Sequence, residues 1–250
     1  MRRPPARRWI RPKVEFLLDG VPTFTPAPPG HVLPIFEWGL NWTIGCWANQ
    51  YLIIHAAVVE RNGRAMIMPG QPGAGKSTLC AALIHRGWRL LSDEFALIVP
   101  KAMQIVPLGR PISLKNESIA LLRDFAPEIS LSEPVEGTTK GTVALARPPD
   151  DCFRKINIHA DPGLIVFPNY QAGAAPKLSR RRKAETFIEL AANSINYGVW
   201  GREGFDVLSQ LVTLCSCFDF TYSDLQQGVG RLSELADGVA PPACGPVALE

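Results

Sequence analysis

The clearest pattern of hydrophobic and polar positions lies in the first third of the chain, where two apolar runs flank a turn. Residues 51–60 read as a strand that is apolar on both faces apart from His55. Asn62 and Gly63 follow, and Asn-Gly between apolar runs is the strongest short signal for a β-hairpin. A second strand is predicted over residues 65–68. We therefore expect these two strands to pair antiparallel.

The rest of the chain alternates between segments with helical spacing and short apolar runs, which predicts an α/β protein. Helices are expected over residues 76–86, 116–125, 184–197, 205–215 and 225–235. Strands are expected within residues 88–99 and over 142–146, 152–158, 163–167 and 218–222. Residues 127–140 and 168–178 are predicted loops. An antiparallel hairpin within this alternation predicts a mixed β-sheet flanked by helices.

The N-terminal segment is different, because it is basic and rich in proline. We predict a proline-rich basic arm with one edge strand over residues 1–45, a domain over 46–236 and a disordered tail over 237–250. Three tryptophans end the arm and begin the domain, namely Trp38, Trp42 and Trp47. Their spacing is typical of a helical or wrapped segment packed on a core, and a base-stacking platform is the alternative interpretation.

Composition narrows the classes of protein. The 46% of hydrophobic residues supports a packed core, and a formal charge of +3 is too small to indicate nucleic acid as the main partner. The six cysteines form no C-x-x-C pair. No apolar run approaches the length of a membrane span, and the basic N-terminus lacks the apolar core of a signal peptide. We therefore expect a cytoplasmic protein without a membrane partner.

A glycine-rich stretch follows the second hairpin strand and precedes the first predicted helix. Gly70, Gly75, Lys76 and Ser77 fit the phosphate-binding pattern G-x-x-x-x-G-K-[ST] in the strand-to-helix context that it requires. Such a loop points backbone N–H groups at phosphate oxygens, while the lysine reaches the terminal phosphates and the serine hydroxyl binds Mg²⁺. An ordinary glycine turn is the weaker alternative. The expected ligands are ATP and Mg²⁺, and the predicted cofactor-binding residues are Gly70, Gly73, Ala74, Gly75, Lys76, Ser77 and Thr78.

Two adjacent acids, Asp93 and Glu94, follow this loop after one predicted helix and one short strand. A phosphoryl-transfer enzyme needs carboxylates to hold Mg²⁺ and to accept the acceptor's proton. We predict that Asp93 and Glu94 supply both roles, with Ser77 as a further metal ligand. A surface turn between two strands is the alternative. For His55, a place in the core and a place near the terminal phosphate are equally supported.

These residues resemble the HPr kinase/phosphorylase family. The resemblance rests on residues 55–59, on the hairpin that leads into the glycine-rich loop, and on residues 92–94. It is closest to the smaller HPr-kinase-related kinases of the kinase A type, which residues 110–119, 140–142 and 189–194 also resemble. The similarity covers about residues 50–235.

The resemblance implies a P-loop, HPr kinase/PEP carboxykinase-like fold and transfer of the γ-phosphoryl group of ATP to a serine hydroxyl. By position it implies that Asp93 is the catalytic acid/base, that His55 is the active-site histidine and that Lys76 binds phosphate. Arg182 is the nearest match to the family's phosphate-sensing arginine, with Arg181 as a rival. Family members are often oligomers, so a homo-oligomer is one state to test.

The chain also departs from the family pattern. Glu94 stands where the family has a second aspartate, and Thr138-Thr139-Lys140-Gly141 lacks the acid of the family's Glu-Ile-Arg-Gly signature. We expect no counterpart of the large N-terminal domain of full-length HPr kinases. We therefore expect a Ser/Thr kinase of a small protein or ribosomally made peptide. The alternatives are a small-molecule kinase on the same scaffold and a nucleotide-dependent adaptor without catalysis.

Overall fold

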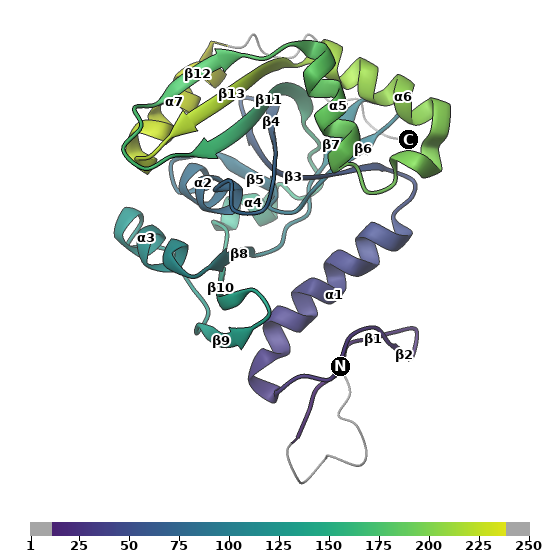
Figure 1. The fold of residues 1–250 in the computed structure, drawn as a ribbon, viewed down its shortest axis with the longest axis vertical. Coiled ribbons are helices and arrows are strands. Elements are labelled where there is room, and N and C mark those ends of the chain that lie inside the picture. Colours follow the sequence, from purple (N-terminus) through teal and green to yellow (C-terminus); the bar gives the residue numbers. More distant parts are fainter. Residues whose placement is uncertain (1–11, 239–250) are drawn as a thin grey trace.

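A mixed eight-stranded sheet forms the centre of the protein (Figure 1), and the computed structural model describes residues 12–238. Its order is β12-β13-β11-β4-β3-β6-β7, and β5 also pairs with β3. Strands β4, β11 and β13 run parallel to one another, while the other pairings are antiparallel. The bounds are β3 (Leu52–Arg61), β4 (Arg64–Pro69), β5 (Arg89–Ser92), β6 (Phe95–Val99), β7 (Gln104–Val106), β11 (Asp161–Tyr170), β12 (Lys177–Arg180) and β13 (Ser216–Tyr222). The α/β class and the mixed sheet are thus confirmed.

The predicted hairpin is β3–β4. The two strands pair antiparallel, with Val58 opposite Ile67, and Asn62 and Gly63 form the turn. Both turn residues have positive φ, at 55° and 77°, as the commonest two-residue hairpin turn requires. The turn chemistry therefore sets the register that carries β4 into the glycine-rich loop.

Helices cover both faces of this sheet, and the strand sequences show why. Along β4, Met66 and Met68 pack on one face with α2 (Lys76–Ile84) and α7 (Leu225–Asp237). Ala65 and Ile67 pack on the other face with α6 (Tyr197–Leu214), and α5 (Lys183–Asn193) lies on that face too. Since successive side chains of a strand point to opposite faces, a central strand covered on both sides is apolar throughout.

A separate antiparallel sheet of three strands lies beside α2. Its order is β8-β10-β9, with β8 (Ile112–Lys115), β9 (Val135–Thr138) and β10 (Gly141–Ala146). Helices α3 (Glu117–Phe125) and α4 (Asp150–Arg154) follow β8 and β10 in the chain. Ile112, Leu114 and Ala144 join the core cluster that contains α2. The end of β8 and the β9–β10 turn are thereby brought to the start of α2.

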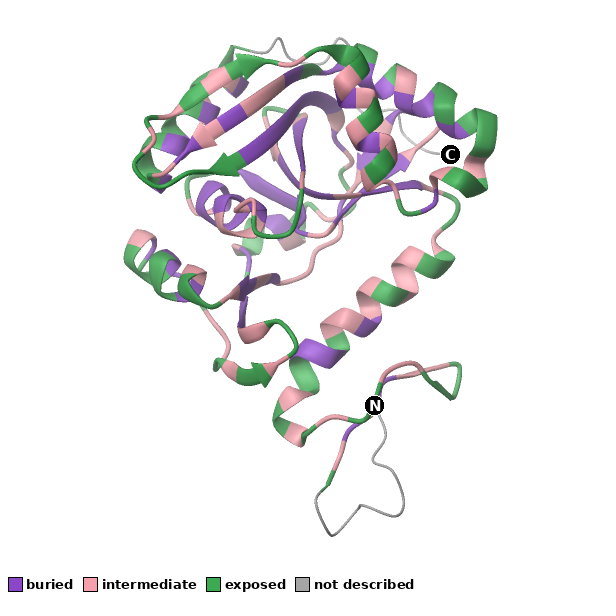
Figure 2. Ribbon diagram, viewed as in Figure 1, coloured by how far each residue is buried: buried purple, intermediate pink, exposed green. Residues whose placement is uncertain are grey.

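The N-terminal segment packs on a long helix, α1 (Val32–Trp47), which crosses residues 45 and 46, where the sequence suggested a domain boundary. Before it, β1 (Leu17–Leu18) pairs with β2 (Val21–Pro22), and η2 (Pro29–His31) leads into the helix. The ring of Phe16 lies so close to Gly39 that a Cβ there would be 2.2 Å from it. The three tryptophans are helical, and Figure 2 shows that much of α1 is exposed or half-buried.

Several predicted elements need correction. Residues 152–158 are not a strand, because Asp150 and Asp151 occupy the first turn of α4 after Pro149. The predicted loop 127–140 contains β9, and the predicted loop 168–178 holds the end of β11 and the start of β12. Helix α5 ends at Asn193, while α6 begins at Tyr197 and is interrupted at Gly201. The predicted tail falls mostly on residues 239–250, outside the described residues, as do the basic residues before Pro12.

Candidate active site

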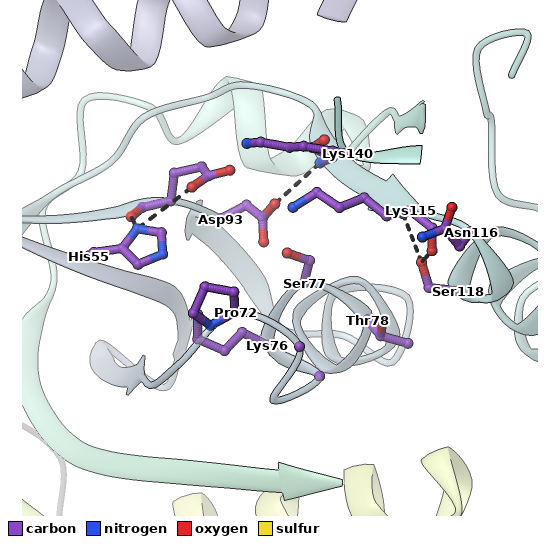
Figure 3. Close-up of a pocket in the computed structure, with 14 residues that line it drawn as sticks. His55, Pro72, Lys76, Ser77, Thr78, Asp93, Lys115, Asn116, Ser118 and Lys140 are labelled. Atoms are coloured by element: carbon purple, nitrogen blue, oxygen red, sulfur yellow. Dashed lines mark hydrogen bonds and ion pairs between the residues drawn. The ribbon is translucent and has the colours of Figure 1, made fainter. Parts of the chain in front are cut away.

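The glycine-rich loop joins β4 to α2 and lines a cavity of about 540 Å³ (Figure 3). Gly70, Gly73 and Gly75 have φ values of 143°, 87° and 87°, which residues other than glycine rarely adopt. Gly75 is the residue before α2, and no side chain caps the first N–H groups of that helix. Uncapped N–H groups and the helix dipole make this end favourable for an anion.

The lysine and hydroxyls of the loop lie in the same cavity. Lys76, Ser77 and Thr78 all line it. The Lys76 ammonium donates hydrogen bonds to the carbonyls of Gly70 at 2.5 Å and Gln71 at 3.1 Å. Burial lowers the pKa of Lys76, and the nearby carboxylates of Glu94 and Asp93 oppose that shift. The Lys76 ammonium is therefore held between the carbonyl groups of the loop and the carboxylates of Asp93 and Glu94.

Asp93 lies at the end of β5 and faces Ser77 across the cavity (Figure 3). Its Oδ2 accepts a hydrogen bond from the Ser113 N–H at 3.2 Å, while its buried Oδ1 has no partner among the described residues. Burial raises the pKa of Asp93 to about 7, and the Glu94 carboxylate adds to this, whereas Ser77 and Ser113 oppose it. A carboxylate with this pKa can exchange a proton near neutral pH.

His55 and Glu94 form a pair on the side of the cavity where Asp93 lies. His55 Nδ1 lies 3.1 Å from the Glu94 carbonyl and 3.7 Å from Glu94 Oε2. Because a carbonyl only accepts, Nδ1 carries the proton in this contact and Nε2 is left as an acceptor. Burial lowers the pKa of His55, and the Lys76 charge lowers it further, although the Glu94 carboxylate acts in the opposite direction.

Two lysines from the three-stranded sheet also line the cavity, and neither was predicted as a site residue from the sequence. Lys115 ends β8 and points toward Asp93, and Lys140 lies in the β9–β10 turn (Figure 3). Burial lowers the pKa of Lys140, and the charge of Lys115 lowers it further. Ser113, Asn116 and Ser118 complete this wall. The only signal in the sequence was that residues 110–119 and 140–142 resemble a kinase group.

Arg182 does not line this cavity. It is the residue before α5, its side chain is 82% exposed, and its Nε donates to Glu185 Oε1 at 2.8 Å. Its rival Arg181 is bound to Asp219, 2.6 Å away, and lies over the Phe167 ring. The other predicted residues, His55, Gly73, Gly75, Lys76, Ser77, Thr78, Asp93 and Glu94, do line it, and Gly70 and Ala74 belong to the same loop.

The residues present fit a magnesium ion that is shared with phosphates. Within residues 12–238, no group of three or more His, Cys, Asp or Glu side chains is arranged to hold a metal by itself. Mg²⁺ bound with a nucleotide needs fewer ligands, since it takes one or two carboxylates and completes its shell with phosphate and water. The oxygen atoms that could bind Mg²⁺ here belong to Ser77, to Glu94 and to Asp93, whose Oδ1 has no other partner among the described residues.

Comparisons with known proteins found two similarities, each over part of the chain. Residues 44–107 match the model of the family described as SynChlorMet cassette protein ScmC. A protein of Fusobacterium nucleatum subsp. nucleatum, described as "Putative HPr kinase/phosphorylase", is 34% identical over 73 residues, which are 26% of this chain and 12% of that protein. The similarity therefore spans one segment of the relative, and it is a weak indication of kinase activity and nucleotide binding.

Proposed function

We propose that this protein is an ATP-dependent kinase with a P-loop, HPr kinase/PEP carboxykinase-like fold. It transfers the γ-phosphoryl group to a Ser or Thr hydroxyl of a small protein or peptide. The observation that carries the proposal is the buried Asp93 carboxylate, with one unpartnered oxygen, in the same cavity as the glycine-rich loop. A carboxylate oxygen that is free of other partners beside a phosphate-type loop can accept the hydroxyl proton during phosphoryl transfer.

The loop side of the cavity binds the nucleotide phosphates. The N–H groups at the start of α2 donate hydrogen bonds to the phosphate oxygens, and Lys76 exchanges its Gly70 and Gln71 carbonyls for the terminal phosphates. Ser77, Glu94 and Asp93 would hold Mg²⁺, which when bound neutralises negative charge on the phosphates. His55 keeps the backbone of Glu94 in place through its Nδ1–H.

The other side of the cavity receives the acceptor. As the acceptor oxygen bonds to the γ-phosphorus, the bond from that phosphorus to the bridging oxygen of ADP breaks, and the hydroxyl proton passes to Asp93. Lys115 and Lys140 would offset charge on the transferred group, whereas Arg182, the nearest match to the family's phosphate-sensing arginine, does not line this cavity. In a small-molecule kinase on this scaffold we would expect residues 168–178 to close the acceptor site, but they line none of this cavity, which favours a protein or peptide acceptor.

Phosphoryl transfer from γ-labelled ATP with Mg²⁺ to a library of Ser- and Thr-containing peptides tests the proposal. We expect transfer by the full-length protein and a loss of about 10²-fold or more in Asp93→Asn. Asp124→Asn, an exposed acid on α3, is the matched control and keeps full activity. Tight ATP binding by calorimetry without transfer to any peptide would instead support a non-catalytic adaptor, and unchanged transfer by Asp93→Asn would refute the role of this residue.

A further inference from the structure

A second cavity of about 420 Å³ adjoins the first one. The two cavities share three residues, His55, Glu94 and Lys140, so they meet at the acid side of the candidate active site. Aromatic and aliphatic side chains form the rest of the second cavity, which we call the aromatic cavity. Its apolar wall is made by Phe24, Trp38, Trp42, Phe95 and Ile195.

Part of this wall is open to solvent, although Phe95 is buried and Phe24 and Trp38 are half-buried. Phe24 meets Trp42 edge to face, with ring centroids 6.1 Å apart, and the Lys140 ammonium lies 5.2 Å from the centre of the Trp38 ring. Trp42 is 51% exposed and Ile195 is 47% exposed. Large apolar groups that stand open to solvent beside a reaction site are typical of ligand-binding surfaces.

Helix α1, which carries Trp38 and Trp42, is held in place relative to Asp93 and Glu94. The buried Arg110 guanidinium lies 3.7 Å from Glu37 Oε2, and it also donates to Asn41. Both partners are on α1, whereas Arg110 belongs to the segment that leads into β8. The aromatic wall is therefore a preformed part of the site, which reduces the entropy lost when a ligand binds.

We propose that the aromatic cavity binds a large apolar side chain of the acceptor peptide, next to the Ser or Thr that receives the phosphoryl group. This inference rests on the proposed function and names the peptide feature that the enzyme recognises. Because the two cavities share residues, an extended peptide, which rises about 3.3 Å per residue, would reach from one to the other within a short stretch of its chain. Asn41 and Lys140 at the edge offer hydrogen-bond donors to the peptide carbonyls.

The charges around the aromatic cavity favour a peptide over a nucleic acid. Glu94 lines it, and Glu37 lies behind it beside Arg110. Lys140 stands beside Glu94 and Arg110 beside Glu37, so the charges roughly balance, and the cavity lacks the excess of positive charge with which proteins bind a phosphate backbone, whereas an apolar side chain needs none. Stacking of bases on the tryptophans is thus the disfavoured alternative, and it forms one outcome of the test below.

The test is phosphoryl transfer to peptides with a fixed central Ser, in which each neighbouring position is held in turn as Trp, Leu, Ala, Lys or Glu. We expect faster transfer when Trp or Leu occupies one position within three residues of the Ser. Trp42→Ala should raise KM for the preferred peptide about tenfold and abolish the preference, with ATP affinity unchanged. Trp47→Ala, a more exposed tryptophan on the same helix outside both cavities, is the matched control and leaves KM unchanged.

The outcomes separate the two proposals. Transfer that shows no apolar preference, or equal KM for Trp42→Ala and Trp47→Ala, would overturn the peptide-binding role and leave the kinase assignment intact. Absence of transfer to every peptide, with ATP bound, would overturn the kinase assignment itself. Quenching of Trp42 fluorescence by a single-stranded oligonucleotide but by no peptide would show that the cavity stacks bases, against this inference.

Discussion

The hydroxyl of Tyr222, on β13, donates a hydrogen bond to the carbonyl of Gly75, 3.4 Å away at the end of the glycine-rich loop. Tyr222 is buried and stacks on Phe220, so its ring has little freedom to move. A Cβ on Gly75 would lie 2.5 Å from this hydroxyl. The strand next to β11 therefore supports the loop from behind.

Gly75→Ala should reduce ATP affinity strongly, because the loop must shift away from Tyr222 and residue 75 must also keep a φ of 87°. Gly73→Ala is the matched control, since it has the same φ but no atom within 4 Å of its Cβ. Both variants pay about 1 kcal/mol of backbone strain. Calorimetric ATP titrations should show the larger loss for Gly75→Ala, with partial recovery in Gly75→Ala/Tyr222→Phe. Equal losses without recovery would contradict the contact.

Asp93→Asn should make the nucleotide-free protein more stable at neutral and alkaline pH. The pKa of Asp93 is raised from 3.8 to about 7, so the folded state binds the proton more tightly than the unfolded state. Wild-type stability therefore falls between about pH 4 and 7, relative to the variant, by at most about 1.4 kcal/mol per pH unit. Denaturant unfolding at several pH values, in the presence of a metal chelator, measures this difference. If the free energy of unfolding of the two proteins depended on pH in the same way, ionisation of Asp93 would not destabilise the folded state.

The pair of Arg89 and Glu60 should contribute much more stability than the surface pairs. Arg89 Nε lies 2.6 Å from Glu60 Oε2, both side chains are largely buried, and Nη1 donates to the carbonyls of Lys155 and Ile158. Glu60→Ala leaves this charge without its carboxylate and should cost about 3 kcal/mol or more. Asp150→Ala, which breaks an exposed pair with Arg147, should cost less than about 1 kcal/mol. Thermal unfolding compares the two, and similar losses would argue against burial as the cause.

Lys140→Met should lower kcat for phosphoryl transfer about tenfold or more, because it removes a cation from the wall opposite the glycine-rich loop. ATP affinity should change less, since Lys76 and the start of α2 remain. Lys101→Met, at an exposed turn, is the control. A variant that changes only ATP affinity would place Lys140 with the nucleotide instead of the transferred group.

The loop side of the site could be predicted because its signals are local. Asn62-Gly63 specifies the turn, and Gly70 to Ser77 specify a phosphate-type loop within one strand-to-helix connection. The opposite wall could not be predicted in the same way. Lys115 and Lys140 come from distant segments, and a lysine carries no pattern that separates a site residue from a solvated surface residue.

The wrong predictions of secondary structure have a similar cause. Edge strands β9 and β12 have few buried side chains, so their formation depends on pairing with β10 and β13 and not on apolar alternation. The short apolar run within residues 152–158 favours a strand, but two acids after a proline favour the first turn of a helix, and the helix forms. Tertiary pairing and helix-end chemistry therefore outweighed the short apolar patterns.

The continuity of β3, β4, α2 and β5 along the chain has a kinetic consequence. Strands β3 and β4 pair across a two-residue turn, so closing that loop costs little entropy, whereas β8 must pair with β10 across the chain between Lys115 and Val143. We expect the β3–β4 hairpin, which leads into the glycine-rich loop, to form early in folding. Strands β8 and β10, with Lys115 and Lys140 beside them, should pack onto it afterwards. Pulsed hydrogen exchange during refolding would show amides of β3 and β4 protected before those of β8 and β10, and the reverse order would contradict this sequence of assembly.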